Sequence, residues 1–330
     1  MNAPIVTAEP SSRASAEIPG VRQAAKRSLL KGRAGEKAIE LVIALVATST
    51  IASILLIFLF VIKEALPILT SAKVQQEASL VRFFNTTIWQ PVSEWPRYGF
   101  APLILGTFKV TLVALLFAIP VGVGAALFTS EFAPRRTKEF LKPIVEILAG
   151  IPSVVLGFFA LIVLASFLQN TLGYDSRLNA FTAGIALSFA VIPTIFSISE
   201  DALTAVPKSL REASLALGAD RWQTAWRVTL PAAQAGILAS ILLGLGRAIG
   251  ETMIVLMASG NASLVTASLF DSTRSLSATI AAELGEVVFG DPHYNTLFFI
   301  GTLLFTMTFL VNLGANLMVD RLKRKLAGKL

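Results

Sequence analysis

Long apolar runs separated by short charged segments are the dominant pattern along the chain. An α-helix needs about 20 residues to cross a hydrocarbon core of roughly 30 Å. Six apolar runs are long enough, at residues 39–62, 103–129, 142–169, 179–199, 235–259 and 295–319. The pattern therefore predicts an all-α membrane protein with six transmembrane helices.

Lys and Arg residues are unevenly distributed among the segments that connect these runs. One set of alternate segments, which includes both tails, holds twenty of them, and the other set holds six. Positively charged residues collect in the cytoplasmic loops of membrane proteins, so both termini are predicted to be cytoplasmic. We interpret the net charge of +7 mainly as a signal of orientation, and we expect contact with membrane lipid and no nucleic-acid partner.

The two patterns together define a domain organisation. It consists of a basic, disordered cytoplasmic tail at 1–38, a first transmembrane helix at 39–62, an external loop at 63–102, a core domain of five transmembrane helices at 103–319 and a basic cytoplasmic tail at 320–330. A long cytoplasmic loop at 205–233 interrupts the core domain.

Composition narrows the chemistry that the chain can perform. Only 15% of the residues are charged, against about a quarter in soluble domains. The sequence has no cysteine, and its single histidine, His293, lies in a polar loop where we expect a solvated side chain. No metal site is therefore expected. The phosphate-binding pattern GxxxxGK[ST] is absent from the sequence, so we expect no ATPase site and no bound cofactor.

The loop before the fifth run carries the most specific pattern. It reads REASLALGADRWQTAWRVTLPAA, residues 211–233, and predicts two short helices separated at Gly218. The first is expected from Lys208 to Leu217 and the second to about Thr229. Glycine suits the left-handed turn that ends a helix. Taken alone, the pattern indicates an amphipathic hairpin on the membrane surface.

The order of residues in this hairpin resembles the EAA loop of ABC importer permeases. It has Glu212-Ala213-Ser214, three residues, Gly218, nine residues, and then Val228-Thr229-Leu230-Pro231, with Ser214 replacing an alanine and Val228 an isoleucine. The resemblance implies a MetI-like bundle whose cytoplasmic coupling loop docks on an ATP-binding cassette ATPase dimer, which binds the ATP and Mg²⁺. The residues that it assigns to coupling are Glu212, Ala213, Gly218, Leu230 and Pro231.

A second unusual feature is a pair of charges inside the fifth apolar run. The stretch GLGRAIGETMIVL, residues 244–256, places Arg247 and Glu251 four residues apart. A charged side chain at a bilayer centre costs about 2.5–3.5 kcal/mol. On an ideal helix both charges lie near a stripe of small residues that permits close helix packing. That stripe is Gly236, Ser240, Gly244 and Ala248. Both charges are therefore expected to face a packed interface and not lipid.

Two interpretations of this pair are open. The two side chains can neutralise one another, or Arg247 can present its guanidinium to a passing tetrahedral anion, whose oxygens match its fork of donors. In the second case Glu251 holds the Arg247 guanidinium in position. Thr252 and Ser153 are neutral donors for such an anion, unless they bond neighbouring helices. Lys109, about two turns below the outer surface, either extends outward or draws anions into the path.

Further segments resemble the two phosphate permeases of ABC importers. GRAIGETM and EILAGIPSVVLGFFAL, the latter at 146–161, are similar to both subunits, whereas MIVLMASGN and SLSATIAAELGE are more similar to the PstC-type subunit. The likeness covers roughly residues 95–325. It implies a multi-pass subunit that imports inorganic phosphate across the prokaryotic inner membrane by alternating access. The implied partners are a PstA-type permease subunit in a heterodimer, the ATPase dimer and an extracytoplasmic phosphate-binding protein.

Other functions are compatible with the same sequence. A permease for molybdate, tungstate or sulfate would share this architecture. A membrane scaffold for phosphate sensing would need the cytoplasmic surfaces but not Arg247. A passive channel would need Arg247 but not the hairpin, so a substitution of Glu212 distinguishes an importer from a channel.

Overall fold

The computed structural model describes residues 19–327. The chain divides into two units, Met1–Leu59 and Phe60–Leu330. Helix α1 (Pro19–Ala65) begins in the first unit and ends in the second. It starts well before the predicted span, so the tail is helical from Pro19, where we expected no regular structure. Strong helix formers such as Ala, Leu, Lys and Arg in this stretch account for the difference. The first part of the predicted tail lies outside the described residues.

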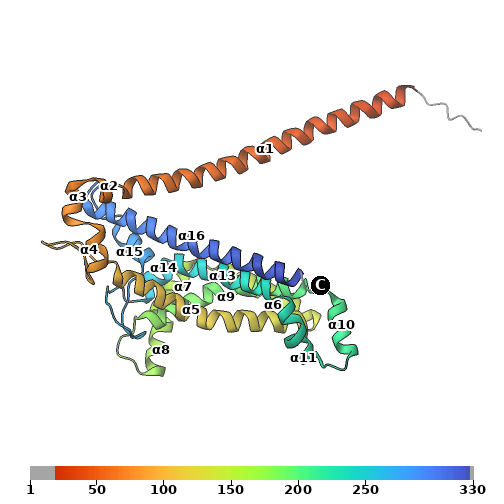
Figure 1. The fold of residues 1–330 in the computed structure, drawn as a ribbon. Helices are drawn as coiled ribbons and strands as arrows, with labels where there is room; N and C mark the ends of the chain where they lie inside the picture. The colour runs from red at the N-terminus through yellow and green to blue at the C-terminus, as the bar shows by residue number, and fades with distance from the viewer. Residues whose placement is uncertain (1–18, 328–330) are drawn as a thin grey trace, which may run out of the picture. The chain divides into compact units, whose positions relative to one another are not determined.

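The second unit combines short helices and strands with a bundle of longer helices (Figure 1). The short elements that precede the bundle are α2 (Pro67–Thr70), α3 (Ala72–Glu77), α4 (Leu80–Asn85) and the antiparallel strands β1 (Trp89–Gln90) and β2 (Arg97–Tyr98). The remaining elements are α5 (Ala101–Leu127), the π-helical η1 (Phe128–Phe132), α6 (Arg135–Gly150), α7 (Ser153–Phe159), η2 (Ala160–Leu164), α8 (Ala165–Leu172), α9 (Ala180–Thr204), α10 (Lys208–Ala216), α11 (Arg221–Thr224), η3 (Ala225–Thr229), α12 (Leu230–Ala232), α13 (Gln234–Gly250), α14 (Met253–Ala258), α15 (Leu276–Glu283) and α16 (Pro292–Ala327).

The bundle has two distinct ends. Figure 1 shows α10 and α11 at the end where α16 finishes, and α2, α3, α4 and α15 at the opposite end. We call the first the hairpin end and the second the α15 end. Helix α16 continues to Ala327, so most of the predicted C-terminal tail is helical at the hairpin end.

Small residues allow α9 to pack closely against two neighbours. A Cβ on Gly184 would lie 2.5 Å from the Cβ of Val113 on α5, so no larger residue fits there. On the other side, a Cβ on Gly244 of α13 would lie 3.0 Å from Ile195, and the hydroxyls of Ser199 and Ser240 are 2.8 Å apart. The predicted small-residue stripe of α13 is therefore confirmed as its packing surface on α9.

The apolar helices agree with the expected number of spans. Within residues 19–327, five helical stretches are long and apolar enough to cross a membrane, and the number rises to six if one bent pair of helices counts as a single span. The five are Ile39–Thr70, Ala101–Phe132, Ser153–Leu172, Ala180–Thr204 and Pro292–Leu322, and the bent pair is Arg221–Ala232 with Gln234–Gly250, at 69° to one another.

Two of the predicted spans are wrong in their boundaries. The third, expected at 142–169, begins only at Ser153, because a residue before proline avoids the helical region and Ile151 is extended (ψ 125°) before Pro152. The fifth, expected at 235–259, is broken: α13 ends at Gly250 and the chain is extended at Glu251 (ψ 132°) before α14 starts.

A buried polar cluster joins the strands, α15 and α16 at the α15 end. Glu283 Oε1 forms an ion pair with Arg274 at 2.7 Å and accepts a hydrogen bond from the indole of Trp89 at 3.1 Å. His293 Nε2 lies 3.3 Å from the other carboxylate oxygen, and its side chain is only 13% exposed. The expectation of a solvated histidine is therefore wrong, since His293 lies in the first turn of α16 and packs against the rings of Trp89 and Tyr98.

The environment of Glu283 favours its charged form. Burial alone would raise the pKa of this carboxyl, but the adjacent His293 ring, the Arg274 guanidinium and the Trp89 indole together hold the pKa below its ordinary value. A carboxyl with a lowered native pKa stabilises the fold above its unfolded pKa of about 4.3. That contribution is lost as the pH falls through the native value.

We predict that Glu283→Gln lowers the stability of the folded chain near neutral pH. The substitution leaves the Arg274 charge buried without its partner, which costs about 3–5 kcal/mol in comparable pairs. The midpoint of thermal unfolding in detergent measures the effect, with the exposed Glu286→Gln as a control on the same segment. The difference between wild type and Glu283→Gln should shrink as the pH drops below about 4. A difference that does not change with pH contradicts the assignment.

Candidate functional site

The helix that carries Arg247 ends one turn later, at Gly250. Glu251 is extended, and Thr252 is the residue immediately before α14. Arg247 and Glu251 therefore do not lie one turn apart on a single helix, and among the described residues no ion pair joins them. Instead Arg247 Nη1 donates to the hydroxyl of Thr194 on α9 at 3.3 Å, and the arginine side chain is exposed on this chain. The predicted role of Glu251 as an ion partner is wrong for this structure.

Neighbouring elements satisfy the backbone at this break. The Ser277 hydroxyl, at the start of α15, donates to the Glu251 carbonyl at 2.7 Å. The Thr252 hydroxyl donates to the Gly250 carbonyl at 3.3 Å. Two segments that the sequence singles out, GRAIGETM and SLSATIAAELGE, thus meet at the Ser277 bond, which fixes where α13 stops.

A second helix break lies between α6 and α7, and α7 contacts α14, the helix that follows the first break. Helix α7 begins at Ser153, directly after Pro152, and packs against α14. A Cβ on Gly157 would lie 3.0 Å from the Met253 carbonyl and from the sulfur of Met257, so glycine permits this approach. Ser153 and Thr252, both predicted donors, thus stand at the starts of two helices in contact, where the first backbone N–H groups have no partner inside the helix.

Lys109 is held by the loop between α14 and α15. Its ammonium donates to the Thr266 hydroxyl at 3.1 Å and to the Ser268 carbonyl at 2.9 Å. The same loop lies against the start of α5, since a Cβ on Gly106 would overlap the Arg274 carbonyl. Lys109 therefore fixes this loop on α5, and its bonds go to the loop and not to the residues at the α13 break.

The hairpin has the predicted form. Helix α10 ends before Gly218, whose φ of +86° is the left-handed conformation, and α11 starts after an Asp220 cap. The second arm extends beyond Thr229 to Ala232, with Pro231 in the first turn of α12. Sequence patterns locate the hairpin well because its turn and cap are local.

The hydroxyl of Ser214 explains a departure from the EAA pattern. It lies 2.9 Å from the Thr224 hydroxyl, and both groups are buried between the two arms. An alanine would fill the same space without this bond. Ser214 therefore contributes to closing the hairpin.

The outer surface of the hairpin is open to a partner. Glu212, Ala213, Gly218 and Pro231 are exposed, and Leu230 is half-buried. Large apolar side chains are exposed beside them, namely Leu215 at 46%, Leu217 at 89% and Trp222 at 60%. Several large apolar side chains exposed on one short hairpin are typical of an interaction site.

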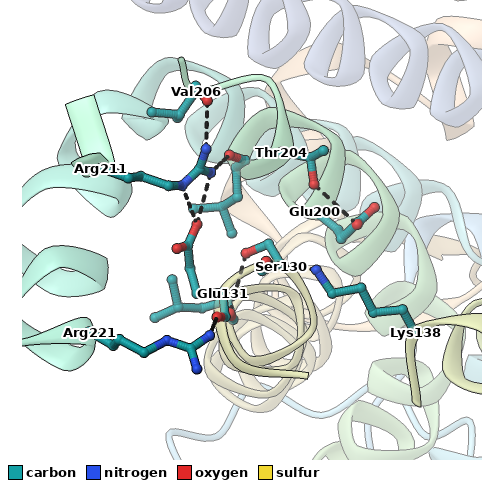
Figure 2. Close-up of polar contacts among 10 residues, drawn as sticks. Ser130, Glu131, Lys138, Glu200, Thr204, Val206, Arg211 and Arg221 are labelled. Atoms are coloured by element: carbon teal, nitrogen blue, oxygen red, sulfur yellow. Dashed lines mark hydrogen bonds and ion pairs between the residues drawn. The ribbon is translucent and has the colours of Figure 1, made fainter. Parts of the chain in front are cut away.

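Sequence reasoning missed a polar network between the hairpin and α5 (Figure 2). Arg211 donates to the Glu131 carboxylate, and Arg221 donates to the Glu131 carbonyl at 2.7 Å. Beside the network is a cleft of about 510 Å³, whose charged lining residues are Glu131, Lys138, Lys208, Arg211, Glu212 and Arg221. No signal in the sequence pointed to this network, because Arg211 and Glu131 are 80 residues apart.

Comparison with known proteins identifies the family. Residues 118–328 match the family described as "Binding-protein-dependent transport system inner membrane component". The chain belongs to this family and is a multi-pass membrane component of an ABC transporter, in a family whose members work with a binding protein and an ATPase.

The similarity to individual relatives extends over most of the chain. It is 40% identical over 245 residues to the probable ABC transporter permease protein YqgH of Bacillus subtilis, covering 74% of this chain and 79% of the relative. It is 36% identical over 259 residues to the phosphate transport system permease protein PstC of Mesorhizobium japonicum, covering 73% and 78%. PstC of Xylella fastidiosa (strain Temecula1) is 33% identical over 293 residues, covering 83% and 89%.

Solved structures show the same fold at low sequence identity. The inward-facing MetNI methionine ABC transporter aligns with a TM-score of 0.53 at 20% identity, over 67% of this chain and 96% of that chain. A bacterial alginate ABC transporter aligns with a TM-score of 0.57 at 18% identity, over 84% and 94%. The predicted MetI-like permease bundle is confirmed.

We predict that Gly218→Ala loosens the hairpin without unfolding the bundle. A side chain in the left-handed conformation costs about 1–2 kcal/mol, which is a factor of about 5–30 in a local opening equilibrium. Hydrogen exchange of amides in α10 and α11 should become faster by about that factor. Gly285→Ala, a glycine without positive φ and with open space around it, is the control. Equal exchange in both variants would contradict the role of Gly218.

Proposed function

We propose that this chain is the PstC-type permease subunit of an ATP-driven importer that moves inorganic phosphate by alternating access. The names of its relatives support phosphate as the substrate, and the observation that carries the proposal is the state of Arg247. Its guanidinium is exposed near the end of an apolar helix and is bonded to a hydroxyl, not to a carboxylate. Such a group attracts an anion.

The physical cost of this arrangement supports a function in transport. An arginine inside a membrane costs about 2.5–3.5 kcal/mol, and Arg247 does not recover this through an ion pair with Glu251. Its side chain points out of this chain, so in the assembled transporter it faces either a partner subunit or a water-filled path. A planar guanidinium binds two oxygens of a tetrahedral anion at once.

The other candidate residues take different roles in this proposal. Thr252 and Ser153 stand at helix starts, where hydroxyl and backbone N–H groups favour an anion. Glu251 acts through its extended backbone, which ends α13. Lys109 holds the external loop against α5 and has no direct contact with the anion.

The proposal includes three kinds of partner. A PstA-type permease subunit completes the path as the second half of a heterodimer. An ATP-binding cassette ATPase dimer, which binds ATP and Mg²⁺, docks on the hairpin at Glu212, Ala213, Gly218, Leu230 and Pro231. A phosphate-binding protein delivers the anion at the α15 end. This chain then carries no ATPase site and no cofactor of its own.

The same proposal fixes an orientation in the prokaryotic inner membrane. The hairpin end is cytoplasmic and the α15 end is extracytoplasmic, with both termini in the cytoplasm. The excess of Lys and Arg in the segments of the hairpin end supports this. Figure 1 also supports it, because α16 finishes at that end.

We predict that Arg247→Gln reduces phosphate uptake by about ten- to a hundredfold, because a hydrogen bond to a charged group contributes about 1.5–3 kcal/mol. The measurement is uptake of labelled phosphate into vesicles that contain the complete transporter and phosphate-loaded binding protein. ATP hydrolysis by the assembled variant should persist. Arg177→Gln, an exposed arginine in the loop before α9, is the control. Normal uptake by Arg247→Gln would show that this arginine has only a structural role and would contradict its place in the anion path.

A second prediction separates an importer from a passive channel. Glu212→Gln removes an exposed carboxylate from the proposed ATPase contact, so uptake should fall to the level seen without ATP. Asp201→Asn, an exposed carboxylate at the end of α9, should transport normally. Uptake that persists in Glu212→Gln would favour a channel.

A further inference from the structure

One residue of α5 contacts both arms of the hairpin. Glu131 lies in η1, the π-helical end of α5, and its Oε1 accepts from Arg211 Nε at 3.0 Å and from Arg211 Nη2 at 2.8 Å. Its backbone carbonyl accepts from Arg221 at 2.7 Å. Figure 2 shows both arginines turned toward Glu131, Arg211 from α10 and Arg221 from α11.

Arg211 also binds the end of α9. Its Nη1 donates to the Val206 carbonyl and its Nη2 to the Leu203 carbonyl, both at 2.7 Å. The side chains of Arg211 and Glu131 are only 20% and 11% exposed, so water competes weakly for these bonds. A single guanidinium thus ties the hairpin to the ends of two bundle helices. Lysine has one compact ammonium and lacks the planar fork that makes this arrangement possible.

Helix α5 has no nearby covalent link to the hairpin. The chain enters α10 from α9 through Pro207 and leaves through Ala233 into α13, whereas Glu131 is 80 residues from Arg211 and 90 from Arg221. Any movement of the hairpin therefore reaches α9 and α13 along the chain but reaches α5 through side-chain contacts. These contacts include the Glu131 network, the packing of Phe132 on Trp222, with ring centres 5.6 Å apart, and a buried apolar cluster that holds Leu127 together with Ala225.

We propose that Glu131 is a positioning residue that transmits movement of the hairpin to α5, through Arg211 and Arg221. This inference rests on the proposed function of the chain as an ATP-driven importer. Movement of the hairpin carries the ends of α5 and α9 with it, so both helices turn together when the ATPases close. Without the carboxylate, ATP hydrolysis continues, but α5 moves less when the hairpin moves. Fewer phosphate ions are then imported for each ATP hydrolysed.

The test is the number of phosphate ions imported per ATP hydrolysed by the reconstituted transporter, for wild type and Glu131→Gln. Glutamine has the same shape but no charge, and Phe132 still packs on Trp222. We expect ATP hydrolysis within about twofold of wild type and a fall in this ratio on the order of tenfold, within the usual range of coupling between sites. Arg211→Lys disturbs the same contact together with the bonds to the Val206 and Leu203 carbonyls, so it should lower the ratio at least as much. The double variant should be little worse than Arg211→Lys alone, because both substitutions act on the Glu131–Arg211 interaction.

Glu139→Gln is a matched control. Glu139 pairs with Arg135 at 2.9 Å, but both side chains are largely exposed, at 63% and 92%, and exposed pairs contribute little. Its ratio should equal that of wild type. An unchanged ratio in Glu131→Gln overturns the inference while leaving the phosphate importer intact. If wild type itself imports no phosphate, the proposed function fails instead.

A distance measurement keeps the inference testable if Glu131→Gln fails to assemble. The chain has no cysteine, so spin labels can be placed at Phe128→Cys on η1 and Ser209→Cys on α10, both exposed positions. In the otherwise wild-type complex, the distance between the labels should be the same with and without ATP, because the two segments move as one body. A distance that changes with ATP overturns the inference.

Discussion

A backbone inside a membrane must find all its hydrogen-bond partners within the protein, and the break of α13 after Gly250 meets this constraint through its neighbours. Ser277 binds the Glu251 carbonyl, and α7 covers the start of α14 because Gly157 leaves room for it. The break stops α13 just after Arg247, so the arginine does not gain a carboxylate in the next turn. Its charge is left available, and the proposed anion path follows from that.

The two ends of the bundle differ in what their side chains hold together. At the α15 end, Lys109, Arg274 and Glu283 fix the loops around the start of α5 through bonds within the chain. At the hairpin end, the exposed outer surface is open to an ATPase, while the inner surface is fastened to α5 and α9. Helix α5 joins both ends, and in the proposed mechanism its attachment to the hairpin through Glu131 carries movement from one end of the bundle to the other.

Features with a local cause were predictable from the sequence. The hairpin follows from Gly218 and its caps, and the stripe of α13 follows from a four-residue spacing of small residues. The break at Glu251 was not predictable, because an ideal helix was assumed and the bond that stabilises the break comes from Ser277, 26 residues later. The ends of the Glu131–Arg211 bond are separated by 80 residues. No local pattern indicates such a contact.

The central claim is that this chain forms part of a pump for phosphate. The most direct measurement is accumulation of labelled phosphate in vesicles that contain the wild-type transporter and its binding protein. ATP or ADP is supplied on the side of the membrane where the ATPase lies, and sulfate or molybdate is added in excess on the opposite side. The account predicts that phosphate accumulates against its gradient with ATP but not with ADP, and that neither competitor reduces this accumulation. Equilibration without ATP, or loss of uptake when a competing oxyanion is present, would contradict it.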